Sequence, residues 1–156
     1  MCALIAGLVP YLVERTIAED GLGCTVLVFL PTYFLIETCH RLLSHSLPEG
    51  VPQYVLHSSV DIEDCMVALR GEDNADARVV LGSAIAESSV TMARVTHVVD
   101  TCRACEIHYT PSSGESSPHI VWTSRAQSQQ RAGRTGRTNN GTVWRVRFAL
   151  FALQLA

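Results

Sequence analysis

The most constraining feature of the chain is an uninterrupted run of β-branched and apolar residues from Thr25 to Leu30, which reads T-V-L-V-F-L. A strand with one face in water alternates polar and apolar residues, whereas a strand covered on both faces has no need to. The run therefore predicts a strand inside a parallel sheet that carries helices on both faces.

Helix-like and strand-like segments alternate around this run. The expected helices cover residues 3–15, 33–46, 61–70 and 124–132, and the other expected strands cover 53–57, 78–82, 95–99 and 142–147. Pro10 is expected to kink or divide the first helix, and Asp61 is a suitable N-cap for the third. Short alternating units are typical of βαβ packing with right-handed crossovers, so we expect an α/β domain with a mostly parallel sheet. Ligands bind beyond the carboxyl ends of such strands, which here are followed by the loops after Leu30, His57, Leu81 and Val99.

A different pattern follows Asp100. Residues 106–109 and 119–123 read as two short strands joined by the Pro-, Ser- and Gly-containing segment 111–118, which predicts a β-hairpin near 105–123. A length of 156 residues suits one compact domain. We place that domain at 1–147 and interpret the apolar tail 148–156 as a truncated or non-native end.

Charge is distributed unevenly along the chain. Residues 1–100 carry 13 acidic residues against 5 arginines, whereas residues 101–156 carry 2 acidic residues against 7 arginines. All 12 basic residues are arginine. The absence of lysine excludes a Schiff-base lysine and a phosphate-binding loop of the Gly-Lys-Ser/Thr type within this chain.

Cysteine usage and the amino terminus indicate a reducing compartment. Six cysteines are too sparse for a disulfide-built secreted scaffold, and no positive region precedes the first apolar stretch. The longest apolar run, residues 24–36, is too short and interrupted to span a membrane. We expect a soluble intracellular protein of the nucleus or the cytoplasm that is not secreted and has no membrane partner.

The strongest motif lies at residues 130–137, which read Q-R-A-G-R-T-G-R. Its arginines stand three residues apart on neighbouring faces of a helix and its end, and Gly133 and Gly136 between them allow close approach of a phosphate chain. Guanidinium groups bind phosphate oxygens in a bidentate manner. On charge alone, a solvated basic face or a nucleic-acid patch is the favoured explanation of the motif.

Further blocks make the chain resemble a known family. Residues 130–137 resemble the sixth motif, Q-R-x-G-R-x-G-R, of superfamily 2 helicases of the DEAH/RNA-helicase-A branch. The other matching blocks, in the family's order, are V-L-V-F-L-P at 26–31, L-H-S-S at 56–59, G-S-A-I-A-E-S-S-V-T at 82–91 and V-V-D-T at 98–101. The resemblance covers residues 4–147. The particular residues found within the matching blocks look most like those of the plant members that carry CCCH zinc fingers.

The resemblance implies a RecA-like, three-layer domain, the second of two that hold ATP and Mg²⁺ between them, with both ligands bound mainly by the first. It implies that Gln130 orients the attacking water or contacts the γ-phosphate, and that Arg134 and Arg137 are arginine fingers. Arg131 would hold the interface between the domains. Glu87 would lie in the loop that couples RNA contact to nucleotide state.

The resemblance also implies contacts to the sugar-phosphate backbone of single-stranded RNA. The residues that match the family's RNA-binding positions are Ser58, Ser83, Ser88, Ser89 and Thr91. Contacts of this kind carry no base information, which suits a motor that moves over any sequence. The chain departs from the family at Ala84, where the family has Asn, and at Thr32, where it has Gly. The D-E-x-H motif is not present in the chain.

Two alternatives remain open. The chain is either half of a helicase motor, inactive alone, or a non-catalytic module that binds RNA or a partner helicase and derives from a degenerate helicase domain. A third reading takes Cys102 and Cys105, with His108 and His119, as ligands of zinc or as a redox pair. The spacing to His119 is loose for such a site, so we expect no metal.

Overall fold

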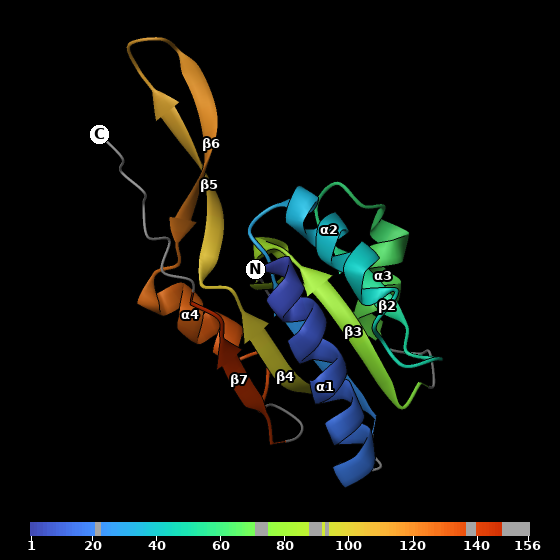
Figure 1. Cartoon of the computed structure of the whole chain (residues 1–156). Coiled ribbons are helices and arrows are strands. Elements are labelled where there is room, and N and C mark those ends of the chain that lie inside the picture. The colour runs from blue at the N-terminus through green and yellow to red at the C-terminus, as the bar shows by residue number, and fades with distance from the viewer. Residues whose placement is uncertain (21–22, 71–74, 88–91, 93, 137–139, 148–156) are drawn as a thin grey trace, which may run out of the picture.

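The computed structural model describes residues 1–20, 23–70, 75–87, 92, 94–136 and 140–147. Its helices are α1 (Cys2–Asp20), α2 (Tyr33–Leu43), α3 (Ile62–Arg70), the 3₁₀ turn η1 (Ala84–Glu87) and α4 (Arg125–Ala132). Its strands are β1 (Cys24–Phe29), β2 (Gln53–Leu56), β3 (Ala77–Gly82), β4 (Val95–Asp100), β5 (Arg103–Thr110), β6 (Glu115–Trp122) and β7 (Thr142–Arg145). Figure 1 shows their arrangement in space.

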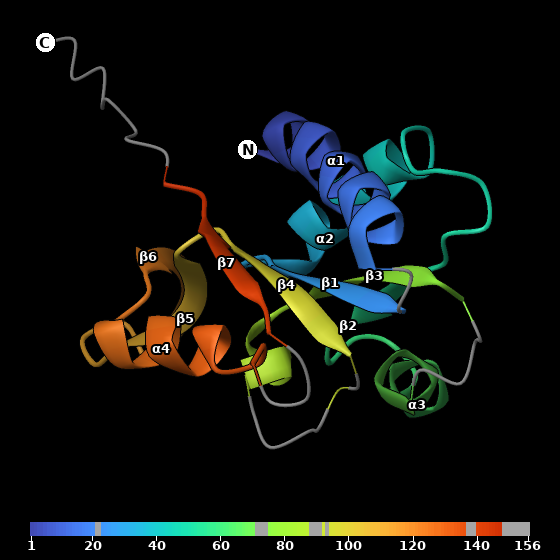
Figure 2. The same cartoon turned by 90° about the horizontal axis from the view of Figure 1, so that it is seen from below.

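Within the described residues, five strands form one parallel sheet in the order β2-β3-β1-β4-β7. The apolar run that begins at Thr25 forms β1, which is buried along its whole length at the centre of the sheet. Helices α1 and α2 cover one face, and α3, η1 and α4 lie against the other (Figure 2). The expected parallel sheet between two helical layers is therefore present.

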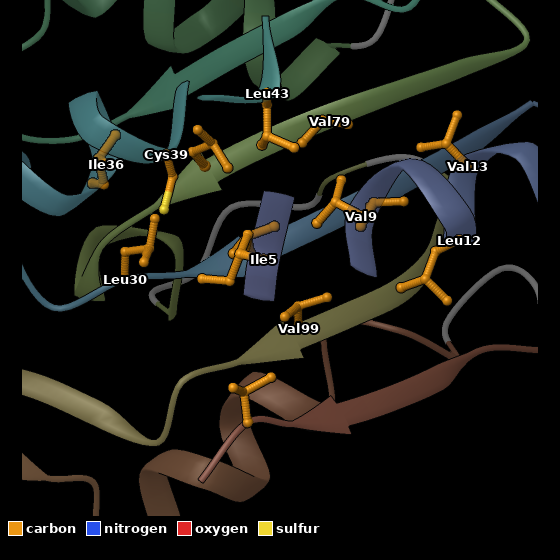
Figure 3. Packing of buried hydrophobic residues seen from close by; sticks show 14 of the residues in the cluster. Ile5, Val9, Leu12, Val13, Leu30, Ile36, Cys39, Leu43, Val79 and Val99 are labelled. Carbon is orange, nitrogen blue, oxygen red and sulfur yellow. The ribbon is translucent and has the colours of Figure 1, made fainter. Parts of the chain in front are cut away.

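Each face of the sheet has its own apolar core. On the α1 and α2 face, Val26 and Val28 of β1 pack with Ile5, Val9 and other buried residues of the helices (Figure 3). On the opposite face, Leu27 and Phe29 pack with residues of β2, α3 and η1. The alternation of side chains along β1 explains why a strand with no polar interruption is required here.

Pro10 does not divide the first helix, because α1 runs without a break from Cys2 to Asp20. Proline removes one backbone hydrogen bond and destabilises a helix by about 3 kcal/mol. The fully buried residues on either side of it, Val9 and Leu12, offset that cost by packing against the sheet. Tertiary packing has overridden the local preference of proline.

The hairpin is longer than its sequence suggests. Strands β5 and β6 pair continuously from Arg103 with Trp122 to Thr110 with Glu115, so the expected loop at 111–118 is wrong from residue 115 onwards. Pro118 lies within β6 and pairs with Ile107. Both strands of a two-stranded ribbon are edge strands, and proline is tolerated at such edges because it has no N–H to leave unpaired.

Candidate functional site

Four strand ends meet at one edge of the sheet, because β1, β2, β3 and β4 all run parallel. A pocket of about 130 Å³ opens at this edge. Its lining combines the ends of β1, β2 and β3 with the start of the hairpin and α4: Leu30, Pro31, His57, Ser83, Ala84, Ala104, Cys105 and Arg131. The sequence motifs after β1, β2 and β3 are thus brought together with the arginine motif.

Ser83 is held in place by backbone contacts. Its N–H donates to the Leu56 carbonyl at 3.2 Å, and its carbonyl accepts from the N–H of Ala86 at 3.0 Å, which closes the η1 turn. A Cβ at Gly82 would lie 2.9 Å from the Ala86 Cβ, so only glycine lets the turn pack this tightly on the end of β3. Ser83 is half-buried at the pocket, whereas Ser58 is exposed.

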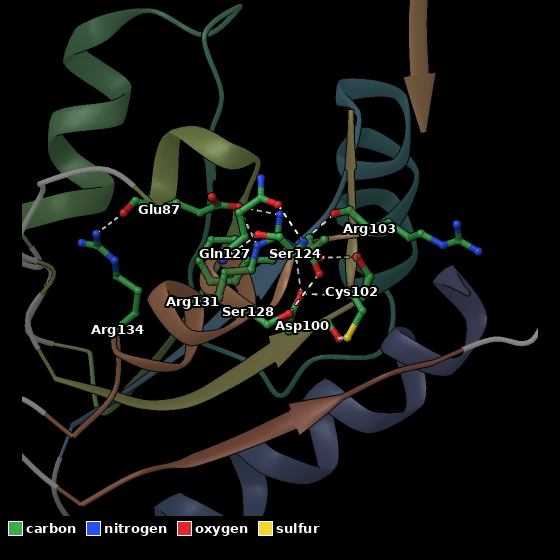
Figure 4. A network of polar contacts seen from close by, with 12 residues as sticks. Glu87, Asp100, Cys102, Arg103, Ser124, Gln127, Ser128, Arg131 and Arg134 are labelled. Carbon is green, nitrogen blue, oxygen red and sulfur yellow. Dashed lines mark hydrogen bonds and ion pairs between the residues drawn. The ribbon is translucent and has the colours of Figure 1, made fainter. Parts of the chain in front are cut away.

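Arg131 is the centre of the polar network in this region (Figure 4). Its side chain is 1% exposed. Its Nε donates to Oε1 of Glu87 at 2.6 Å, its Nη1 donates to Oδ1 of Asp100 at 2.7 Å, and the same Nη1 donates to the Arg103 carbonyl at 3.1 Å. The guanidinium also lies over the Phe29 ring, 4.8 Å from the ring centroid. Arg131 therefore ties the η1 turn, the end of β4 and the base of the hairpin to α4.

The two carboxylates that hold Arg131 come from distant parts of the chain. Asp100 is fully buried, and its Oδ1 also accepts the N–H of Cys102 at 2.9 Å. Glu87 ends the η1 turn and forms an ion pair with Arg131 Nη2 at 2.5 Å. A buried arginine is tolerated only when its charge is paired and its donors are satisfied, which both acids achieve here.

A capping box fixes the start of α4. The Gln127 N–H donates to the Ser124 hydroxyl at 3.1 Å, and the Ser124 N–H donates to the Gln127 side chain at 2.9 Å. This reciprocal pair satisfies two backbone donors that the helix cannot satisfy itself. The helix that carries the arginine motif therefore begins at a defined residue.

The rest of the arginine motif occupies the end of α4. Gln130 is exposed. Arg134 is 8% exposed and donates a hydrogen bond to the Glu87 carbonyl. Gly133 follows the helix as its cap, and Gly136 has a φ of +76°, in the region that glycine favours.

Four of the predicted site residues lie outside the described residues: Arg137, Ser88, Ser89 and Thr91. Among those described, the structure brings Ser83 and Arg131 to one pocket and links Glu87 to both Arg131 and Arg134. The sequence did not identify Asp100 as a partner of Arg131. A signal was present, since Asp100 is an acidic residue directly after an apolar strand.

Cys102 and Cys105 are both free thiols, and they line different pockets. Burial raises the pKa of the Cys102 thiol, and the charge of Asp100 adds to that effect. His108 and His119 do come together on the hairpin, with ring centroids 4.7 Å apart. No cluster of three or more metal-ligating side chains occurs among the described residues.

None of the helices in the described part of the chain has the length and apolarity needed to cross a membrane.

Comparison with known proteins agrees with this geometry. Residues 9–139 match the model of the helicase conserved C-terminal domain. The chain is 37% identical over 143 residues to the DExH-box ATP-dependent RNA helicase DExH8 of Arabidopsis thaliana, covering 92% of this chain and 14% of that protein. It is 39% identical over 129 residues to the zinc finger CCCH domain-containing protein 4 of Oryza sativa subsp. japonica, covering 82% of this chain and 12% of that protein.

The fold is also similar to a solved structure. The DExH-box NTPase HrpB of E. coli superposes with a TM-score of 0.76 at 24% sequence identity, over 90% of this chain and 17% of that chain. This likeness, with the strand order described above, confirms the expected RecA-like α/β fold. The chain spans less than a fifth of each of these proteins.

Proposed function

Because the chain belongs to the helicase conserved C-terminal domain family, we propose that it acts as the second motor domain of an ATP-dependent RNA helicase of the DExH/DEAH type. In this role it supplies arginine fingers to ATP bound on a first RecA-like domain and grips the backbone of single-stranded RNA. The relatives named above, an RNA helicase and a CCCH zinc finger protein, support the RNA helicase class.

The observation that carries the proposal is the buried network around Arg131. By bonding to Glu87 and Asp100, Arg131 fixes α4 against the sheet, with Gln130 exposed and Arg134 at the end of the helix. A side chain can stabilise a transition state only if its position is fixed in advance, since reorganisation during the reaction would lower its contribution. We propose that Arg134 and Arg137 neutralise charge that develops on the γ-phosphate, and that Gln130 orients the attacking water.

Glu87 connects this network to the proposed RNA contacts. Its side chain bonds to Arg131 and its carbonyl accepts from Arg134, while the η1 turn that it ends begins next to Ser83. A shift of α4 on nucleotide binding would therefore move the turn that positions Ser83. We propose that Ser83 and Ser58, together with Ser88, Ser89 and Thr91, bind the sugar-phosphate backbone, so that nucleotide state and RNA grip are coupled.

Mg²⁺ accompanies ATP in such enzymes and neutralises phosphate charge when bound. The described residues contain no group of three or more His, Cys, Asp or Glu side chains that could hold a metal ion. We propose that the first RecA-like domain holds Mg²⁺, and no step on this chain runs through it.

A complementation assay tests the proposal. The chain is mixed with a separately expressed first RecA-like domain from the same locus, and RNA-stimulated ATP hydrolysis is measured. We expect activity only in the mixture, and a fall of about 10³- to 10⁵-fold in the R134A and R137A variants if each is an arginine finger.

Arg41 provides the matched control, because it is an exposed arginine on α2. The R41A variant is expected to retain the activity of the unsubstituted mixture. If the two domains bind each other and show no hydrolysis, the motor assignment is wrong and the chain is a non-catalytic binding module. The departure from the family at Ala84, an exposed residue at the pocket, is the feature that favours that alternative.

A further inference from the structure

A second pocket lies between the start of α4, the base of the hairpin and the end of β7, and the proposed motor function does not use it. Its volume is about 470 Å³. The lining residues are Cys102, Thr123, Arg125, Ser128, Gln129, Arg145 and Arg147. Three of these seven residues are arginines and none is acidic, so the pocket is strongly electropositive.

The three arginines, Arg125, Arg145 and Arg147, form no ion pair with any carboxylate in the described part of the chain. Arg145 is the last residue of β7, Arg147 follows it by two residues, and both line the pocket. Burial raises the pKa of the Cys102 thiol and the charge of Asp100 raises it further, whereas Arg147 and Arg145 lower it, so charges of both signs lie near this lining residue. The Asp100 carboxylate near Cys102 is ion-paired with Arg131, so the three lining arginines have no carboxylate partner of their own among the described residues.

The position of Arg125 adds to the unbalanced charge. Arg125 is the first residue of α4, where the helix dipole already places partial positive charge. A cation at a helix N-terminus is unfavourable unless an anion lies close by. Arg131 differs in this respect, since it is neutralised by Glu87 and Asp100.

Neutral donors complete the pocket. The hydroxyls of Thr123 and Ser128 lie 3.0 Å apart on its wall, and hydroxyl groups donate readily to phosphate oxygens. Trp122, which precedes Thr123, is 48% exposed, and Arg103 stacks on its ring with Cζ 3.4 Å from the ring centroid. Proteins that bind single-stranded nucleic acid combine arginines that contact the backbone with aromatic rings on which bases stack. Trp122 is not part of the pocket lining, and Arg103 already covers one face of its ring.

We propose that this arginine pocket binds a phosphate of a single-stranded RNA, as a contact additional to those of Ser58 and Ser83. The inference rests on the proposed function, in that it takes RNA as the polyanion. Three guanidinium groups and two hydroxyls match the oxygens of one or two successive phosphodiesters. The pocket is larger than a single phosphate group, which leaves room for the attached sugar.

Fluorescence anisotropy of a labelled oligouridylate, titrated with the chain over a series of salt concentrations, tests this site. We expect the R145Q/R147Q variant to bind about tenfold more weakly and to reduce the slope of log K against log salt by about 0.7 for each phosphate that it no longer neutralises. R125Q is the second variant, and it removes an unfavourable charge from a helix start, so its fold is not endangered. The control is R41Q/R70Q, which removes two exposed arginines of α2 and α3.

The outcomes separate the possible sources of the anion. If the R145Q/R147Q and R125Q variants show the same slope of log K against log salt as the unsubstituted chain, the proposal is overturned. It is also overturned if inorganic phosphate displaces the labelled oligouridylate as well as unlabelled oligonucleotide does at the same concentration of phosphate groups. The same conclusion follows if the variants lose binding to poly-glutamate and retain binding to RNA. ATP hydrolysis by the mixture of the two domains tests the motor function separately. If the pocket variants bind RNA like the unsubstituted chain while RNA-stimulated hydrolysis is intact, only this inference is contradicted.

Discussion

At the scale of single residues, Arg131 has a role that its sequence motif did not reveal. The spacing of the arginines predicted a basic surface, and the resemblance placed Arg131 at an interface between domains. In the structure its side chain is buried and bonds to Glu87, Asp100 and the Arg103 carbonyl of the same domain. Spacing alone could not show this, because the side of α4 that faces inward is determined by packing against β4 and η1.

Replacing Arg131 tests the importance of this network. R131M leaves Asp100, a fully buried carboxylate, without its cationic partner, and we expect a loss of about 3–5 kcal/mol in the free energy of unfolding. Urea denaturation followed by circular dichroism measures it. The control is R41Q, an exposed change expected to stay within about 0.5 kcal/mol.

A milder change keeps the test informative if R131M does not fold. E87Q removes the charge of the second partner and retains its size, so we expect a loss of about 1–3 kcal/mol. Because both changes break the same ion pair, the R131M/E87Q double variant should lose less stability than the sum of the two single variants. Additive losses would show that Arg131 and Glu87 do not stabilise each other.

At the scale of elements, prediction succeeded where burial leaves a distinctive pattern. The run at β1 could be recognised as a central strand because its residues are apolar on both faces. The hairpin was underestimated because its strands are largely exposed, so polar residues and Pro118 occur within them without disrupting the pairing. In α1, the continuation past Pro10 is supported by buried residues on both sides of it, Val9 and Leu12, whose packing local sequence does not encode.

The turn between β3 and η1 gives a test at this scale. G82A places a methyl group 2.9 Å from the Cβ of Ala86, and neither group is flexible, so the turn must shift. We expect a loss of about 1–3 kcal/mol in stability and weaker RNA binding, because Ser83 begins the displaced turn. Thermal unfolding and oligouridylate anisotropy measure the two effects.

The chain offers a matched glycine for comparison. Gly7 lies in α1, and a methyl group added there would meet no described atom within 4 Å, so G7A is expected to raise stability by about 0.5–1 kcal/mol and to leave RNA binding unchanged. If G82A behaves like G7A, the close packing of η1 on β3 is not required for the position of Ser83.

At the scale of the whole molecule, several of the residues that we propose to be functional lie where the strands end. The sheet brings the segments after β1, β2 and β3 to one pocket, and α4 adds the arginine motif to the same pocket through Arg131. The arginines that make up the excess of positive charge after residue 100 include the buried Arg131 of the 130–137 motif and the three arginines of the separate arginine pocket. Composition predicted the excess, but only the fold could show where these arginines lie.

The proposed division of function between a first RecA-like domain, which binds ATP, and this domain predicts that the chain hydrolyses no ATP by itself. It contains no lysine, so a Gly-Lys-Ser/Thr phosphate loop cannot form within it, and its described residues hold no metal-binding cluster. Arginine fingers stabilise charge on a phosphate that another group must first bind and position, so on their own they give little catalysis. We expect phosphate release at the level of the buffer blank, with and without single-stranded RNA.

An R134A sample purified in parallel distinguishes a contaminating ATPase, whose activity would not change, from turnover by the chain, which would fall. Turnover above the blank that disappears in R134A would mean that the chain binds and activates ATP unaided, and the two-domain motor would have to be abandoned.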